Sequence, residues 1–186
     1  DLLDNLTLTA NTSTDFYTER RGERIAVGSV EQASYNEDVR EVQETNVGAR
    51  LSYDGQITET VSLQATAGTE YRYNSFNSNL GSTNGGLASP GVYTLENSVT
   101  RPNITDYFQE QGVVGLYGDV SLGYNELVYL GGSLRNDWSS TLPSDQNSYL
   151  YPSVNASFVF SSLPALEDSD VLSFGKVRAN WSQVGR

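Results

Sequence analysis

The sequence predicts an all-β fold, an antiparallel up-and-down meander of about seven strands. Two observations predict it. Only 37% of the 186 residues are hydrophobic and 18% are charged, so the polarity comes mainly from Ser, Thr, Asn, Gln, Gly and 12 Tyr, a composition that favours strands and turns over helices. Apolar residues also recur at every second position in several segments, which is the period of a strand with one apolar face.

The first three strands follow from this alternation. Residues 5–11, 46–54 and 57–73 each place apolar side chains on one face and polar side chains on the other. The longest of them sets Ile57, Val61, Leu63, Ala65, Ala67, Tyr71 and Tyr73 against a face of Thr, Ser, Gln, Gly, Glu and Arg. Asp54-Gly55 is a two-residue turn signal, so 46–54 and 57–73 are predicted to form a hairpin.

Four further strands are predicted after residue 110. They cover residues 111–124, 128–138, 149–160 and 176–182, and each alternates in the same way. Gly123 to Asn125 supplies the turn after the first, and Pro143-Ser144-Asp145 supplies the turn after the second. The connection at 161–170 is of moderate length.

The remaining connections are long, at about 20–40 and 74–107, and in a meander they fall on one end of the sheet. Tight turns at one rim and large loops at the other are typical of outer-membrane barrels, with the tight turns in the periplasm. Leu63, Leu116, Val120 and Leu134 would then face lipid. Aromatic residues of the apolar face gather at both ends, as in the two girdles of such barrels: Tyr53, Tyr124 and Phe160 at the tight-turn end, and Tyr71, Tyr73, Trp138 and Trp181 toward the long loops.

The opposite face would line a hydrated lumen. Its candidate lumen-facing residues are Arg50, Glu70, Arg72, Tyr117, Asp119, Arg135, Asp137 and Arg178. A soluble seven-stranded sandwich also alternates and solvates its outer faces, so it stays open as an alternative. The length of segment 57–73 argues against it, because strands of globular proteins are usually shorter.

Composition excludes several function classes. The net charge of −12 has the wrong sign for nucleic-acid binding. The absence of Cys and His removes thiol nucleophiles, Cys/His zinc sites and Ser-His-Asp triads. We assign no catalytic residue, cofactor or metal and expect a protein that is not an enzyme. No apolar run reaches the length of a transmembrane helix, and the first residues lack the regions of a signal peptide, so we expect an internal piece of a longer chain.

Several runs resemble the barrel region of SusC/RagA-type TonB-dependent outer-membrane transporters. They are GLYGDVSLGYNELVYLGGSLRNDWSSTLP at 115–143, NSYLYPSVNASFVFSSL at 147–163 and LSFGKVRANWSQVG at 172–185. Upstream, PGVYTLEN at 90–97 and NVGARLSYDG at 46–55 also match, whereas residues 1–40 match only in character. The most specific parts are RNDWSSTLP at 135–143, YPS at 151–153 and LSFGK-x-R at 172–178.

The resemblance implies a transmembrane barrel of about 22 strands, occluded by a plug, in the outer membrane of Bacteroidota-like bacteria. It implies active import of glycans or peptides, energised by the TonB complex, with a SusD-like surface lipoprotein as the partner at the mouth. Residues 1–186 would be part of that barrel, with the plug, the TonB-binding region and the remaining strands absent from this chain. A barrel that acts as a non-transporting scaffold for surface lipoproteins or assembly factors would share the same wall and is the alternative.

Individual sites have competing interpretations. Arg135 and Asp137 lie on the same face as Ser133, so they contact either substrate or plug, or form a charge ladder that satisfies neighbouring strands; the ladder is favoured. Trp138 and Trp181 are interpreted as membrane anchors. The acids Glu37-Asp38 and Glu167, Asp168 and Asp170 lack calcium-loop spacing and are expected to be ordinary solvated acids.

The segment 74–107 is too long for a simple connection. Its Gly-, Ser- and Asn-rich first half is expected to be mobile. Its second half contains Tyr93, Tyr107 and Phe108, which we expect to contact the SusD-like lid or the ligand, with Tyr93 as the anchor. The alternative, that these side chains pack on neighbouring loops of the same barrel, is equally favoured.

Overall fold

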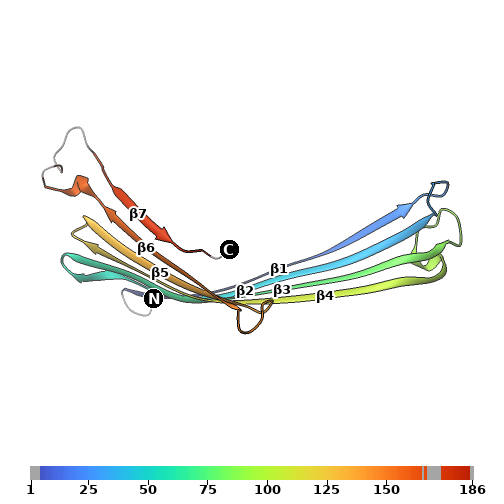
Figure 1. Ribbon diagram of the computed structural model, residues 1–186, viewed down its shortest axis with the longest axis horizontal. Helices are drawn as coiled ribbons and strands as arrows, with labels where there is room; N and C mark the ends of the chain where they lie inside the picture. The colour runs from blue at the N-terminus through green and yellow to red at the C-terminus, as the bar shows by residue number, and fades with distance from the viewer. Residues whose placement is uncertain (1–4, 165, 167–172, 185–186) are drawn as a thin grey trace. The chain divides into compact units, whose positions relative to one another are not determined.

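The computed structural model describes residues 5–164, 166 and 173–184, and its strands form one sheet in which each strand lies beside the next in sequence (Figure 1). The strands are β1 (Leu6–Ile25), β2 (Ser34–Thr58), β3 (Val61–Leu87), β4 (Ser98–Tyr124), β5 (Val128–Ser139), β6 (Ser148–Phe158) and β7 (Val177–Ser182). Two short 3₁₀ helices, η1 (Leu95–Asn97) and η2 (Phe160–Ser162), follow β3 and β6. The predicted all-β meander of seven antiparallel strands is confirmed.

The described residues divide into two compact units. The seven-strand unit contains Asp1–Ser13, Asn46–Arg72 and Gly112–Arg186, and the four-strand unit contains Thr14–Thr45 and Tyr73–Gln111. The first therefore holds β5, β6, β7 and one section of each earlier strand, and the second holds the other sections of β1 to β4. None of the described helices is both long enough and apolar enough to span a bilayer.

Cross-strand register sorts the side chains of the seven-strand unit into two faces. Val114 lies opposite Trp138 and Leu122 opposite Leu130, whereas Tyr117 lies opposite Arg135 and Asp119 opposite Ser133. The same division continues into β6 and β7, where Val154 lies opposite Trp181. Directly opposed residues of an antiparallel pair share a face. We call the two sides the apolar face and the polar face.

The apolar face is not covered by a second layer. Among the described residues, Val159 is the one buried hydrophobic side chain, at 7% exposure, and Leu116, Leu130, Leu134 and Val154 are all more than half exposed. A sandwich requires a second sheet packed on this face. The described strands all belong to one sheet, so the sandwich alternative is wrong.

The first predicted turn is in the wrong place. Asp54-Gly55 lies inside β2, and the turn is at Glu59-Thr60, where the Thr58 hydroxyl accepts hydrogen bonds from the backbone N–H groups of Thr60 (3.3 Å) and Val61 (3.1 Å). Gly55 serves packing instead: a Cβ there would come within 2.8 Å of the Asn5 and Tyr53 side chains. The turn expected at Gly123 to Asn125 is at 125–127, with Asn125 and Glu126 both at positive φ, as type I′ hairpin turns require.

The two long connections are mostly strand. The connections proper are only 26–33 and 88–97, so the predicted loops 20–40 and 74–107 are too long, and the section of 74–91 expected to be mobile is regular β3 up to Leu87. Alternation could not reveal this section of β3, because both of its faces are mostly small and polar residues. Side chains support the hairpin instead: the Asn97 amide donates to Ser89 O (2.8 Å) and Val92 O (2.7 Å) and closes the connection.

Phe160 is not on a strand face as predicted. β6 ends at Phe158, and Phe160 begins η2. Its ring covers Gly175, where a Cβ would lie 2.3 Å from the ring carbons. The two described ends of the connection after β6 therefore pack against each other.

Candidate functional site

The polar face of the seven-strand unit carries the candidate site. Arg135 is its centre: its Nε donates to Asp137 Oδ1 (2.8 Å), and its Nη1 donates to Glu70 Oε2 (3.0 Å). Arg135 also lies over the Tyr117 ring, with 5.7 Å from Cζ to the ring centroid. The favoured interpretation of Arg135 and Asp137, a charge ladder between strands, agrees with these contacts, which connect β3, β4 and β5.

Two glycines make this cluster possible. Gly115 lies opposite Asp137 on β4, between β3 and β5. A Cβ at Gly115 would come within 2.6 Å of Arg135 Nη2 and 2.7 Å of Asp137 Oδ1, so with a larger residue here the Arg135 and Asp137 side chains would have to shift. Gly68 gives the same room to Tyr117, whose ring lies 2.5 Å from the Cβ position. Sequence reasoning missed both glycines, because no local pattern shows that the side chain of a residue on another strand passes over a given glycine.

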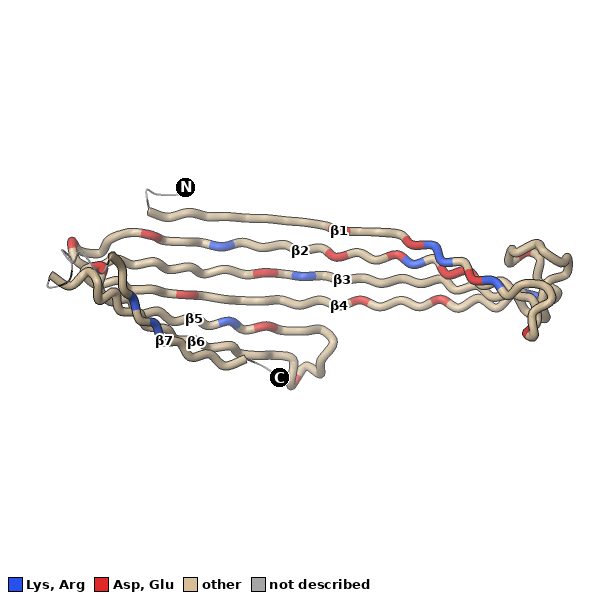
Figure 2. Tube along the Cα trace, turned by 90° about the horizontal axis from the view of Figure 1, so that it is seen from above, with Lys and Arg blue, Asp and Glu red and all other residues tan. Residues whose placement is uncertain are grey.

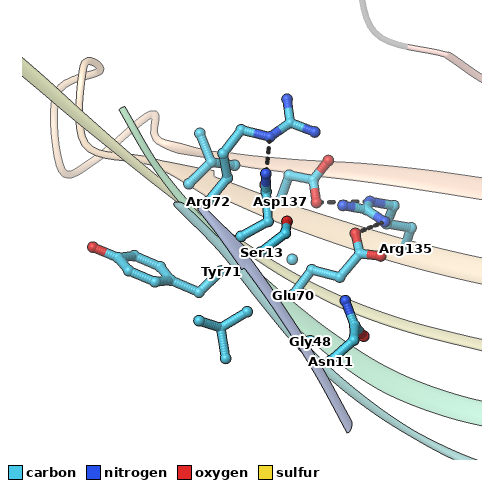
Figure 3. A pocket seen from close by; sticks show the side chains of 12 residues that line it. Asn11, Ser13, Gly48, Glu70, Tyr71, Arg72, Arg135 and Asp137 are labelled. Carbon is cyan, nitrogen blue, oxygen red and sulfur yellow. Dashed lines mark hydrogen bonds and ion pairs between the residues drawn. The ribbon is translucent and has the colours of Figure 1, made fainter. Parts of the chain in front are cut away.

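A polar hollow of ≈ 500 Å³ adjoins the cluster. Its lining comes from β1 to β5 and is drawn in Figure 3: Asn11, Ser13, Asn46, Val47, Gly48, Glu70, Tyr71, Arg72, Val113, Gly115, Arg135 and Asp137. Four of the predicted lumen-facing residues meet here, namely Glu70, Arg72, Arg135 and Asp137. Arg72 extends toward Asn46, and its Nε donates to the Asn46 Oδ1 at 3.2 Å.

The other predicted lumen-facing residues share the polar face but not the hollow. Asp119 lies opposite Ser133, and Arg178 lies opposite Ser157. Arg50 is exposed on β2 and lines no part of the hollow. A second polar hollow, of ≈ 240 Å³, lies at the turns 59–60 and 125–127 and includes Gln64, Ser121 and Tyr129.

The predicted girdle residues have mixed positions. Tyr124 and Trp138 lie at opposite ends of the β4–β5 ladder, and both are exposed. Trp181 lies opposite Val154 near the middle of β6, whereas Trp138 lies opposite Ser148 at the start of β6, so the two tryptophans are not at the same register level. Tyr53 is half-buried beside Gly55, and Tyr71 is exposed and reaches over Gly112. Tyr73 lies in the four-strand unit, where its hydroxyl bonds to Glu110.

The four-strand unit holds a set of ion pairs. Figure 2 shows positive and negative residues interspersed along β1 and β2 in this region. Glu37 accepts from Arg20 (2.5 Å) and from the Tyr35 hydroxyl (2.9 Å), and these two donors lower the pKa of its carboxyl. Asp38 is 9% exposed and accepts from Ser78 Oγ (2.7 Å) and Arg40 Nε (2.5 Å); the Ser78 hydrogen bond, with the Arg40 guanidinium, lowers its pKa.

Glu37 and Asp38 are therefore structural acids with dedicated partners, and the expectation of simple solvated acids is wrong for this pair. The reason is the tertiary pairing: their donors come from β1, β2 and β3. No group of three or more His, Cys, Asp or Glu in the described part of the chain is arranged to hold a metal ion. The other predicted acidic group, Glu167, Asp168 and Asp170, lies outside the described residues.

Tyr93 joins the two connections of the four-strand unit. Its hydroxyl accepts the Val27 N–H at 3.2 Å, and Arg24 lies over its ring at 5.3 Å from the centroid. Gln32 adds a hydrogen bond to Gly85 O at 2.9 Å. Tyr107 and Phe108 are strand residues of β4, not loop residues as predicted; Tyr107 packs edge-on against Phe76, with 5.8 Å between centroids. Both are more than half exposed.

Comparison with solved structures identifies the fold. The RagAB peptide transporter matches with a TM-score of 0.87 and 20% identity, over 97% of this chain and 21% of that chain. The RagAB peptide importer matches in its "open-open" state with a TM-score of 0.84 and in its "closed-closed" state with 0.86; each is 20% identical and covers 97% of this chain and 20% of that chain.

The chain has the fold of a section of RagAB. It spans about a fifth of the length of the matched chains. No family model matches the sequence, and no curated protein matches it. The predicted meander of seven antiparallel strands is confirmed as the fold of one section of these structures, and the matched structures are those of a transporter rather than an enzyme.

Proposed function

We propose that this chain is a section of the barrel wall of an outer-membrane, TonB-dependent importer of glycans or peptides. The main support for this proposal is the structural similarity to the RagAB peptide transporter, with TM-scores of 0.84 to 0.87 over 97% of this chain. The resemblance of the 115–143, 147–163 and 172–185 runs to SusC/RagA-type barrels points the same way.

The two faces of the seven-strand unit support a position in a membrane. Leu116, Leu130, Leu134 and Val154 would be costly to leave in water, and a lipid environment removes that cost. The polar face would line the lumen, where ion pairs such as Glu70 with Arg135 stay hydrated. In this arrangement the turns 59–60 and 125–127 face the periplasm, and the connections 26–33 and 88–97 lie outside the cell.

Uptake measurements test the importer proposal. The full-length protein should support uptake of a glycan or peptide that stops when TonB is deleted, because the import energy comes from the TonB complex. Uptake that is unchanged without TonB, for every glycan and peptide offered, would contradict import and favour the scaffold alternative. A matched strain that lacks only this protein provides the baseline.

A SusD-like surface lipoprotein is the proposed partner at the mouth. Val27, Val30 and Val92 are exposed on the two outer connections, and exposed apolar groups of this kind are typical of interaction surfaces. Tyr93 would hold the two connections in place beneath the partner through its bond to Val27 N. Replacing Val30 and Val92 with Asp should reduce copurification of the lipoprotein. Val99→Asp, on β4 rather than on a connection, is the control, and equal copurification from both variants would contradict the contact.

A further inference from the structure

Arg72 differs from the other charged residues of the hollow. Glu70 and Asp137 both pair with Arg135, so these three side chains neutralise one another in part. Arg72 makes one hydrogen bond, from Nε to the neutral Asn46 amide, and no ion pair with any described residue. In Figure 3 the dashed lines join Glu70 and Asp137 to Arg135, and none reaches the terminal nitrogens of Arg72.

We propose that the terminal nitrogens of Arg72 bind a carboxylate of the imported ligand. A guanidinium presents two parallel N–H groups that match the two oxygens of a carboxylate, and the Asn46 bond fixes its orientation through Nε without occupying that fork. The hollow of ≈ 500 Å³ gives the ligand room beside the fork. This inference rests on the importer function and adds the chemical class of the ligand.

The charges that line the hollow favour binding of an anion that belongs to the ligand rather than to this chain. The two carboxylates that line the hollow are already held by Arg135, at 2.8 Å and 3.0 Å. With Glu70 and Asp137 against Arg135 and Arg72, the four charges of the hollow sum to zero (−2 and +2). A ligand carboxylate would therefore meet a site of zero net charge, in which the one charged group outside an ion pair is a cation. Free peptide termini, acidic side chains and uronic acids all carry this group.

Binding assays on the full-length protein test the site with paired probes. One pair is an octapeptide with a free C-terminal carboxylate and its C-terminal amide; the other is an oligogalacturonate and its methyl ester. Arg72→Gln should weaken binding of the carboxylate probe roughly tenfold or more, since hydrogen bonds between charged groups are among the strong ones. Binding of the uncharged partner probe should not change, and the pair that responds identifies the source of the carboxylate.

The control is Arg50→Gln, because Arg50 is also exposed on the polar face and without an ion pair among the described residues, but lies outside the hollow. It should bind both members of each pair like the wild type. If Arg72→Gln and Arg50→Gln bind the carboxylate probes equally well, or if wild-type protein does not distinguish carboxylate from uncharged probe, the carboxylate site is wrong. TonB-dependent uptake in the wild type is scored separately, so the importer function can stand when the site fails.

Discussion

At the scale of single residues, the site depends as much on missing side chains as on charged ones. The spacing of Arg135 and Asp137 predicts that they share a face, and they do. Glu70 is 65 residues away from Arg135 in sequence, and no local pattern could link the two. The link needs Gly115 on the strand between them. Sequence reasoning therefore finds the charged residues of such a site but not the glycine over which two of them make contact.

Filling Gly115 should disturb this cluster. In Gly115→Ala the added Cβ would lie 2.6 Å from Arg135 Nη2, and the flexible end of Arg135 would have to leave Glu70. We expect a loss of about 1 kcal/mol in the free energy of unfolding, measured by urea titration of the full-length protein in liposomes. Gly132→Ala is the control, because its nearest neighbour, Ser153 O, is at an ordinary 3.5 Å. Equal stability of the two variants would show that Arg135 adapts without cost.

The paired acids of the four-strand unit should make it sensitive to acid. The pKa of Asp38 is lowered from 3.8 in the folded protein, first by Ser78 and then by Arg40. Its stabilising effect is therefore complete above the unfolded-state value and is lost as the pH falls through the lower, folded-state value. Glu37 follows the same sign through Arg20 and Tyr35.

Hydrogen exchange of β2 and β3 amides in the full-length protein, corrected for intrinsic rates, should show protection that declines below about pH 4. Asp38→Asn should flatten that decline. Asp106→Asn, at an exposed acid of β4 with no ion pair among the described residues, should leave it unchanged. A decline that is the same in wild type and Asp38→Asn would contradict a role for this carboxyl.

At the scale of strands, alternation predicts the sections that have one apolar face and fails where both faces are polar. Alternation predicts a strand at 128–138 and β5 is Val128–Ser139, because Leu130, Leu134 and Trp138 mark one face. The β3 section near 74–87 has little such contrast, because Phe76 and Leu80 are the only large apolar residues of one face and the remaining residues are mostly Ser, Asn, Thr and Gly. The first turn is also misplaced by sequence reasoning. Asp54-Gly55 has the composition of a turn, but the chain turns at 59–60, where the Thr58 hydroxyl accepts the Val61 N–H.

Depth along the strands should govern the cost of a charge on the apolar face. Leu134 lies opposite Gly118 and Pro152 in the middle of the ladder, whereas Leu116 is nearer the Trp138 end. Leu134→Arg should therefore cost roughly 2 to 4 kcal/mol of folding stability, and Leu116→Arg and Leu63→Arg should cost less. Urea unfolding in liposomes measures all three.

The matched control is Ser121→Arg, because Ser121 is on the polar face of β4 and borders a hollow of ≈ 240 Å³ that can take the side chain. It should cost less than Leu134→Arg. Equal, small costs at Leu134 and Ser121 would contradict a lipid-facing apolar surface.

At the scale of the whole chain, the exposed apolar face of the seven-strand unit explains why the fold class is predictable from the sequence. The alternation, the turns and the order β1 to β7 are all local properties of the sequence. The function is not local in the same way. The matched transporters work with a chain about five times longer than this one. This chain therefore establishes a fold, whereas its activity is a proposal.

The described sheet has two open edges. β1 and β7 are the terminal strands of the sheet, and no described strand pairs with their outer edges. In a bilayer each unpaired backbone group costs several kcal/mol, so an open sheet of seven strands cannot be stable there as a monomer. The isolated 186-residue chain, added to liposomes, should remain unfolded or associate through its edges. The full-length protein, treated identically, should give a compact, heat-modifiable band on a gel and resist trypsin. A trypsin-resistant, β-rich, membrane-inserted species of the isolated chain with a mass near 20.3 kDa by light scattering would show that the edges are satisfied without further strands, and the barrel-section interpretation would then be wrong.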